Sequence, residues 1–167
     1  ESKKYYHTIK PTAENIDEQQ RINLVREGIV STVYSMLKNN HKVILVYPVP
    51  ENAFNPIKIL FKKKNKFFNI FNKDYFFPIL STSYSVYKKR NKLIFETLDS
   101  IQNDNIYRVY PHKYFCDNQM KNRCVANSKD TIYYSDDDHL SVQGSALVVE
   151  DIVDMIKRIK NYATCHA

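Results

Sequence analysis

Apolar residues recur at helical spacing in three long stretches of the chain. The first runs from about Ala13 to Asn39, where the apolar positions are Ile22, Val25, Ile29, Val33 and Met36. Steps of three and four residues are typical of an amphipathic helix, and the polar pair at 39–40 ends it. The same spacing predicts a second helix over 83–101 and a C-terminal helix that begins after Ser141, a residue suited to the N-cap.

Two short apolar runs have a different character. Val43–Tyr47 is continuously apolar and rich in β-branched residues, which favours a buried strand, most often in a parallel sheet. Pro48 ends this run, because proline cannot donate to a sheet ladder. Ile106–Tyr110 predicts a second strand that ends before Pro111.

Two shorter segments also have a predicted secondary structure. We expect a short helix over 56–64 and a short extended piece over 131–134. Helices that alternate with buried strands predict a layered α/β domain. The length of 167 residues fits one core, so we assign residues 1–167 to a single domain.

Charge and glycine content narrow the classes of function. The formal charge is +7, and much of the excess is lysine, as in Lys62–Lys64 and Lys88–Arg90. We interpret these runs as a solvated face and expect no nucleic-acid partner, because neither run belongs to a nucleic-acid-binding motif. Gly28 and Gly144 are the two glycines of the chain, so neither a G-x-G-x-x-G nor a Walker A phosphate loop can be written.

The chain carries no sequence signal of a membrane span or of a secretory leader. No apolar run approaches the roughly 18–20 residues that a span needs. The first residues, Glu1–Lys4, are not followed by the apolar core of a signal peptide. Because an initiator methionine is also absent, we expect a processed chain or a piece of a longer one.

Three cysteines leave several interpretations open. Cys116 and Cys124 lie close together in a polar segment, and Cys165 stands near the C-terminus. A bridge between the first two would stabilise the fold by about 2–3 kcal/mol through chain entropy and would imply an oxidising compartment. The alternatives are free thiols or a partial zinc site, for which His112 is the nearby candidate ligand.

The acidic cluster Asp136-Asp137-Asp138, followed directly by His139, is the strongest candidate for chemistry. It stands between a short strand and a helix. An aspartate three residues before a histidine can fold back across a tight turn and accept the Nδ1–H, which leaves Nε2 free to act as a base. Two alternatives remain: the acids can cap the following helix, or Asp136, Asp138 and His139 can bind a divalent metal. Spacing alone favours capping, then the acid–base pair, then metal.

The segment around this cluster resembles a known family. Tyr133–Ala146, with the sequence YYSDDDHLSVQGSA, resembles the last block of the SGNH domain at the C-terminus of bacterial integral-membrane O-acyltransferases, which acylate cell-surface polysaccharides. Val43–Glu51 resembles the family's strand ending in Pro-x-Pro-Glu, and the pair Cys116 and Cys124 resembles its two cysteines.

The resemblance implies a fold and a set of roles. The fold would be a three-layer SGNH-hydrolase-like (flavodoxin-like) α/β domain with a parallel sheet flanked by helices, of which this chain is the C-terminal portion without its N-terminal part. His139 matches the catalytic base and Asp136 the acid that orients it. Ser141 and Gly144 match structural positions at the start of the last helix. The resemblance also implies that Cys116 and Cys124 are bridged, with Cys165 free.

One departure from the family pattern limits the expected activity. The family's nucleophile belongs to a Gly-Asp-Ser block, which does not occur here; Asp99-Ser100 lacks the glycine and lies in a predicted helix. We therefore expect either a nucleophile on an upstream segment or a degenerate domain, and little activity from this chain alone.

The implied setting is extracytoplasmic. The partners would be an acyl donor or polysaccharide acceptor and an upstream transmembrane acyltransferase domain, with no cofactor and no metal. The resulting function is transfer or hydrolysis of a small acyl group on glycan hydroxyls in the periplasm or another extracytoplasmic space. The alternative is a non-catalytic extracytoplasmic domain that binds anionic glycan through its lysines.

Overall fold

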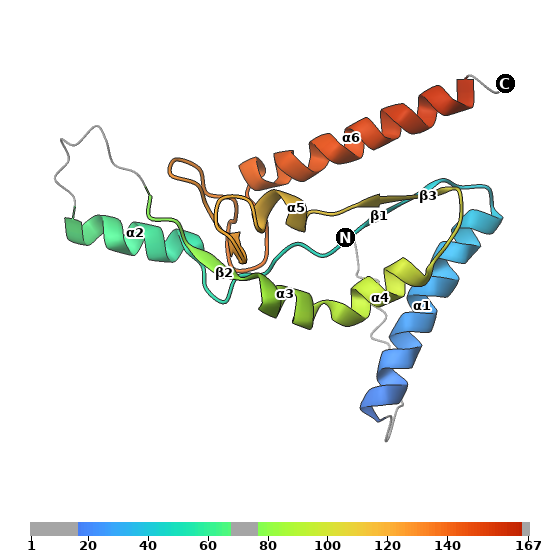
Figure 1. Ribbon diagram of the computed structural model, residues 1–167, viewed down its shortest axis with the longest axis horizontal. Coiled ribbons are helices and arrows are strands. Elements are labelled where there is room, and N and C mark those ends of the chain that lie inside the picture. The colour runs from blue at the N-terminus through green and yellow to red at the C-terminus, as the bar shows by residue number, and fades with distance from the viewer. Residues whose placement is uncertain (1–16, 68–76, 165–167) are drawn as a thin grey trace, which may run out of the picture.

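A parallel pair of strands lies at the centre of the domain, between helices on both faces (Figure 1). The computed structural model describes residues 17–67 and 77–164. Strand β1 (Val43–Val46) pairs with β3 (Ile106–Val109), with Val43 opposite Ile106. Helices α1 (Glu18–Lys38) and α4 (Lys92–Ser100) cover one face of the pair, and α6 (Val142–Thr164) covers the other. The predicted α/β layering, with a parallel pair flanked by helices, is therefore confirmed.

A second group of elements lies beside this centre. It begins with α2 (Pro56–Phe67), as the sequence predicts for 56–64. The short strand β2 (Ser81–Ser83) then pairs antiparallel with β4 (Arg123–Val125). Between them lie α3 (Tyr84–Arg90) and the single turn α5 (His112–Phe115).

Helix α1 starts later than its apolar pattern indicates. Asp17 has an extended backbone and accepts a hydrogen bond from the Gln20 amide, while the Gln20 side chain accepts from the Asp17 amide. This reciprocal capping box fixes the first helical residue at Glu18, so the expected start near Ala13 is wrong.

The buried stripe of α1 is also shorter than predicted. Val33 and Leu37 are buried, whereas Val25 and Met36 are 55% and 45% exposed. The helix packs on β1 and α4 near its C-terminal end, and its N-terminal half projects away from the sheet (Figure 1).

The predicted helix over 83–101 is two helices that meet at Asn91. The Asn91 amide and its side-chain Nδ2 both donate to the carbonyl of Tyr87, at 3.0 Å each. These bonds satisfy the carbonyl that ends α3 and leave Asn91 as the residue before α4. The predicted apolar stripe is nevertheless buried at Tyr87, Leu98 and Ile101.

Strand β1 is less buried than its composition predicts. Leu45 and Tyr47 are buried, Val43 and Ile44 are half-buried, and Val46 is 45% exposed. Within the described residues β1 pairs with β3 alone, so its other edge has no strand beside it. A strand inside a larger parallel sheet has a neighbour along each edge, whereas β1 has one along a single edge in this part of the chain.

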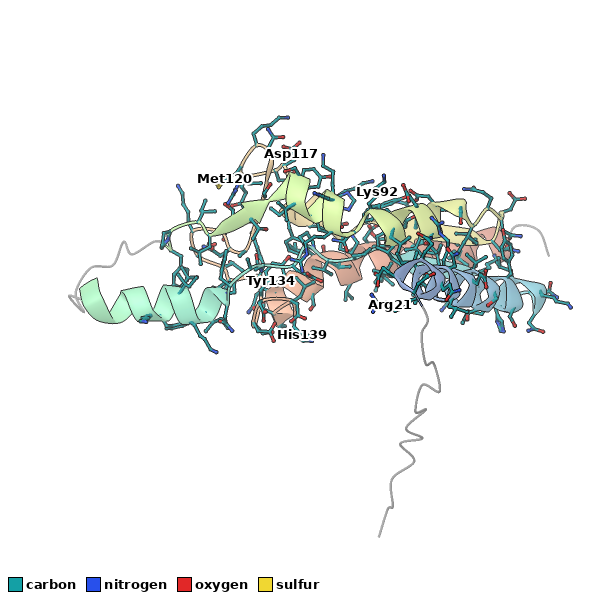
Figure 2. The ribbon with its side chains drawn as sticks, turned by 90° about the horizontal axis from the view of Figure 1, so that it is seen from below. Arg21, Lys92, Asp117, Met120, Tyr134 and His139 are labelled. Atoms are coloured by element: carbon teal, nitrogen blue, oxygen red, sulfur yellow. A yellow bond between two sulfur atoms is a disulfide. The ribbon has the colours of Figure 1, made fainter. Side chains whose placement is uncertain are left out.

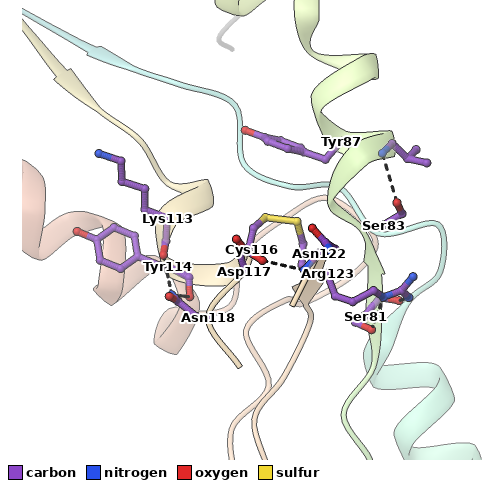
Figure 3. The surroundings of a disulfide bond; sticks show 12 residues. Ser81, Ser83, Tyr87, Lys113, Tyr114, Cys116, Asp117, Asn118, Asn122 and Arg123 are labelled. Carbon is purple, nitrogen blue, oxygen red and sulfur yellow. Dashed lines mark hydrogen bonds between the residues drawn. A yellow bond between two sulfur atoms is a disulfide. The ribbon is translucent and has the colours of Figure 1, made fainter. Parts of the chain in front are cut away.

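Cys116 and Cys124 form a disulfide, as the family resemblance implies (Figure 3). The bridge joins the segment after α5 to β4, and Asp117 beside it accepts a hydrogen bond from the amide of Asn122. The two thiols are therefore not free to bind zinc with His112. Cys165 lies outside the described residues.

Helix α6 begins at the predicted position, directly after Ser141. Ser141 Oγ accepts the amide of Gly144 at 3.1 Å, which confirms Ser141 as the N-cap. No helix in the described ranges combines the length and the apolar character that a membrane crossing requires.

Candidate active site

The acidic cluster forms a tight turn between the extended segment 131–134 and α6. Tyr134 and Leu140 form an isolated antiparallel bridge across its base. Inside the turn, the Ser135 amide donates to the carbonyl of His139 at 2.9 Å. One carboxylate oxygen of Asp136 accepts two backbone amides, from Asp138 at 3.0 Å and His139 at 2.7 Å. The aspartate thus shapes the turn that presents the histidine.

The same aspartate holds the imidazole of His139. Its Oδ2 lies 2.9 Å from Nδ1 and its Oδ1 lies 3.1 Å away, within the hydrogen-bond reach that the D-x-x-H spacing predicts. Asp138 Oδ1 is also 2.9 Å from Nδ1 as an ion-pair contact. Among the described residues, none forms a hydrogen bond with Nε2, so this nitrogen is available to a reacting group.

The hydrogen bonds and charges of the turn lower the pKa of Asp136 and raise the pKa of His139, and both changes favour an ionised carboxylate beside a protonated imidazole. The pKa of Asp136 falls to about 2, mainly because the amides of His139 and Asp138 donate to its carboxylate. The pKa of His139 is raised, first by its hydrogen bond to Asp136 and then by the charges of Asp136 and Asp138. His139 is therefore a stronger base than an ordinary histidine, held by an acid that stays ionised.

A comparison with known protein families gives a match over most of the chain. The family model of the SGNH domain, described as fused to AT3 (acyltransferase 3) domains, matches residues 2–154. The chain belongs to the SGNH domain family. No curated protein and no solved structure matches it.

Two contacts outside the turn position the site of this SGNH domain. The amide of Asn52, which follows the Pro-x-Pro-Glu segment, donates to the carbonyl of Asp137 at 2.6 Å. Ser141 Oγ donates to the carbonyl of Ile132 at 2.7 Å and so ties the start of α6 to the extended segment. The sequence pattern did not identify Asn52, although its place directly after the prolines that end β1 is a signal for a site residue.

Gly144 lies where the backbones of two elements nearly touch. A Cβ built on Gly144 would stand 2.1 Å from the carbonyl oxygen of Tyr133, far inside van der Waals contact. Glycine is required here for close approach, and its φ is not positive. The expectation that Ser141 and Gly144 are structural positions at the start of α6 is confirmed.

The sequence left two alternatives to an acid–base pair open: capping of α6 by the acids, and binding of a divalent metal. Capping of α6 falls to Ser141, since Asp136 accepts amides of its own turn and no acid occupies the first turn of α6. A metal would use Asp136, Asp138 and His139, whose ligand atoms all lie within 4.8 Å of one another. That group is exposed and already joined by hydrogen bonds and ion pairs.

Among the described residues, no serine hydroxyl forms a hydrogen bond with the His139 imidazole, and the Ser135 hydroxyl donates to the His139 carbonyl instead. Ser100 is the last residue of α4 and donates to the carbonyl of Thr97, as expected from its place in a helix. Ser141 uses its hydroxyl for the contacts that fix α6. A pocket of about 330 Å³ beside Tyr134 and Ser141 does not include His139, whose side chain is 75% exposed. This part of the chain therefore presents an imidazole, held by Asp136, on an open surface.

Proposed function

We propose that this SGNH domain supplies the acid and base of a Ser-His-Asp site that transfers or hydrolyses a small acyl group on hydroxyls of a cell-surface polysaccharide. The observation that carries the proposal is the placement of His139 Nδ1 at 2.9 Å from Asp136 Oδ2, with Nε2 unbonded among the described residues. The family's association with acyltransferase 3 domains supports the acyl chemistry.

The proton transfers follow from this geometry. Nε2 of His139 takes the proton of a serine hydroxyl as the serine oxygen attacks the acyl carbonyl carbon. The imidazolium then gives that proton to the departing donor oxygen, and the acyl group stays on the serine. An acceptor hydroxyl, or water, next loses its proton to Nε2 and attacks the acyl carbonyl carbon; the bond to the serine oxygen breaks, and the imidazolium gives its proton to that oxygen, which regenerates serine and neutral histidine. Asp136 stabilises the imidazolium at each stage.

The serine comes from an upstream segment of a parent chain in this proposal. Two features of the fold support a missing neighbour. Strand β1 pairs on one side only within the described residues, and Val46 is 45% exposed. Helix α6 leaves Val149 50% and Val153 41% exposed on the face turned away from the core. Apolar exposure of this kind marks surfaces that another segment covers.

The disulfide supports an extracytoplasmic setting for the same site. Disulfides form and persist in oxidising compartments such as the periplasm. The bond between Cys116 and Cys124 thus fits a domain tethered outside the cytoplasm to a membrane acyltransferase domain.

Hydrolysis of p-nitrophenyl acetate tests the proposal directly. We expect little turnover by the 167-residue chain, because a base and its acid form no acyl-enzyme without a nucleophile. The same chain extended upstream through a Gly-Asp-Ser segment of its parent should be active, and His139→Ala should remove most of that activity. His41→Ala, a change of another exposed histidine, is the matched control and should leave the rate unchanged.

Two results would contradict the assignment. One is robust turnover by the short chain that persists in His139→Ala. The other is an extended chain whose activity is equally insensitive to His139→Ala and His41→Ala. Either result would place the reacting base elsewhere.

A further inference from the structure

A second pocket, of about 260 Å³, opens between α3, α4 and the start of α5. Aromatic rings form much of its wall: Tyr84, Tyr87, Phe95 and His112. The His112 ring centroid lies 5.6 Å from that of Phe95 and 5.7 Å from that of Tyr87. Tyr84 and Tyr87 stack with their planes 22° apart. Aromatic side chains therefore gather around one small space.

The rim of this pocket carries balanced charges. Two lysines and two carboxylates line it: Lys88, Lys92, Glu96 and Asp99. Glu96 lies 3.7 Å from the Lys92 ammonium, and Lys88 Nζ stands 4.5 Å above the Tyr84 ring. A strongly anionic or cationic ligand would meet a like charge at this rim. A neutral ligand with hydroxyl groups would find both donors and acceptors there.

One polar atom of the pocket wall is unsatisfied. Nδ1 of His112 is buried and has no hydrogen-bond partner in the described part of the chain. The pKa of His112 is lowered, first by burial and then by the charge of Lys113, so the ring is neutral at pH 7. Because Nδ1 itself is closed off from solvent, His112 lines the pocket with other atoms of its ring.

We propose that this pocket binds one neutral sugar ring of a glycan chain. A pyranose presents an apolar C–H face, which fits aromatic faces with their negative quadrupole, and hydroxyl groups, which fit the mixed rim. The volume is near the lower end of small-molecule pockets, roughly 300 Å³, and so suits a single ring.

The pocket is distinct from the acid–base pair. Figure 2 shows Lys92, on the rim, and His139 on opposite faces of the domain. The proposal does not rest on the acyl chemistry, because binding needs no nucleophile. A glycan held at this face would keep its chain near the domain while another part of the chain reacts.

Titration of the 15N-labelled 167-residue chain with methyl glucoside, followed by NMR, tests the proposal. We expect shifts of the amides around 84–96 and 112 and a measurable Kd. Tyr84→Ala and Phe95→Leu should each raise that Kd by roughly tenfold, because each removes one ring face. Tyr34→Ala is the matched control: Tyr34 lies on α1, is 44% exposed and does not line the pocket.

Charged probes test the ligand class with the same measurement. Glucuronate and choline should bind more weakly than methyl glucoside, because each meets a like charge on the rim. Tighter binding of either charged probe would overturn the assignment to a neutral sugar. So would the absence of shifts with methyl glucoside, or a Kd that neither Tyr84→Ala nor the more conservative Phe95→Leu changes.

Discussion

Replacing Asp136 by asparagine tests how the imidazole is held. The amide oxygen of the new side chain can still accept the backbone amides of Asp138 and His139, so the turn should persist in Asp136→Asn. The substitution, however, removes the carboxylate charge that receives the Nδ1–H at 2.9 Å. Nε2 then carries the proton in a larger fraction of molecules and cannot take one from a hydroxyl.

The expected loss of rate is smaller than in a buried triad. In serine proteases the equivalent change lowers kcat about 10⁴-fold. Here Asp138 stands 2.9 Å from the same nitrogen, and the His139 side chain is 75% exposed to water, so both can partly replace the lost acceptor. We expect a loss of roughly 10²-fold for Asp136→Asn and about 10⁴-fold when Asp138→Asn is added, since the two acids share one partner.

The assay is p-nitrophenyl acetate hydrolysis by the extended, active chain, with Asp137→Asn as the matched control. Asp136 and Asp138, and not Asp137, contact the His139 ring in the described residues, so removing the Asp137 charge should leave the rate nearly unchanged. Imidazole 15N shifts of the 167-residue chain give a readout independent of the nucleophile, and Asp136→Asn should move the neutral proton from Nδ1 toward Nε2. Equal rates in Asp136→Asn and Asp137→Asn, with an unchanged tautomer, would refute the reasoning.

Three further outcomes follow from particular contacts. Gly144→Ala should destabilise the domain by about 1–3 kcal/mol in urea denaturation, because its Cβ meets a backbone carbonyl, whereas Gly28→Ala, with nothing within 4 Å, should stabilise it by about 0.5–1 kcal/mol. Equal effects of the two changes would contradict this account. Reduction of the bridge between Cys116 and Cys124, separated by 8 positions, should cost about 2–3 kcal/mol in the same assay and add two hydrogens by mass. The raised pKa of His139 predicts that hydrolysis by the extended chain rises with pH through a midpoint above 6.5, since the base must be neutral; a midpoint below 6.5 would count against the pair.

The parts of the molecule that sequence predicts best are those set by short-range contacts or by composition. The D-x-x-H contact spans three residues, so backbone geometry alone brings Asp136 to His139. The parallel pairing of β1 with β3 agrees with the β-branched, apolar sequence of β1 and with the helices that separate the two strands along the chain. The catalytic roles of the two residues stay a prediction.

The parts that sequence missed depend on long-range partners or on single polar residues. Strand β2, with the sequence Ser-Thr-Ser, has no apolar alternation and is a strand because β4 pairs with it. The break at Asn91 depends on one side chain that returns to Tyr87. Asn52 reaches the candidate site only because the folded chain carries the segment after β1 to the turn. Hydrophobic periodicity holds no information on such contacts.

Asp136 and His139 belong to one short turn, and this affects how thermal motion would act on the proposed site. Asp136 and His139 move together when the turn moves, because the carboxylate is bonded to the backbone amide of the residue it orients. If a serine on another segment is the nucleophile, as proposed, thermal motion of the surrounding layers would change its distance from Nε2 of His139, while the distance from Nδ1 to Asp136 would stay almost constant. The rate of the proposed site would then depend mainly on how closely the serine segment docks. The His139 ring would already be oriented by Asp136 before the serine arrives.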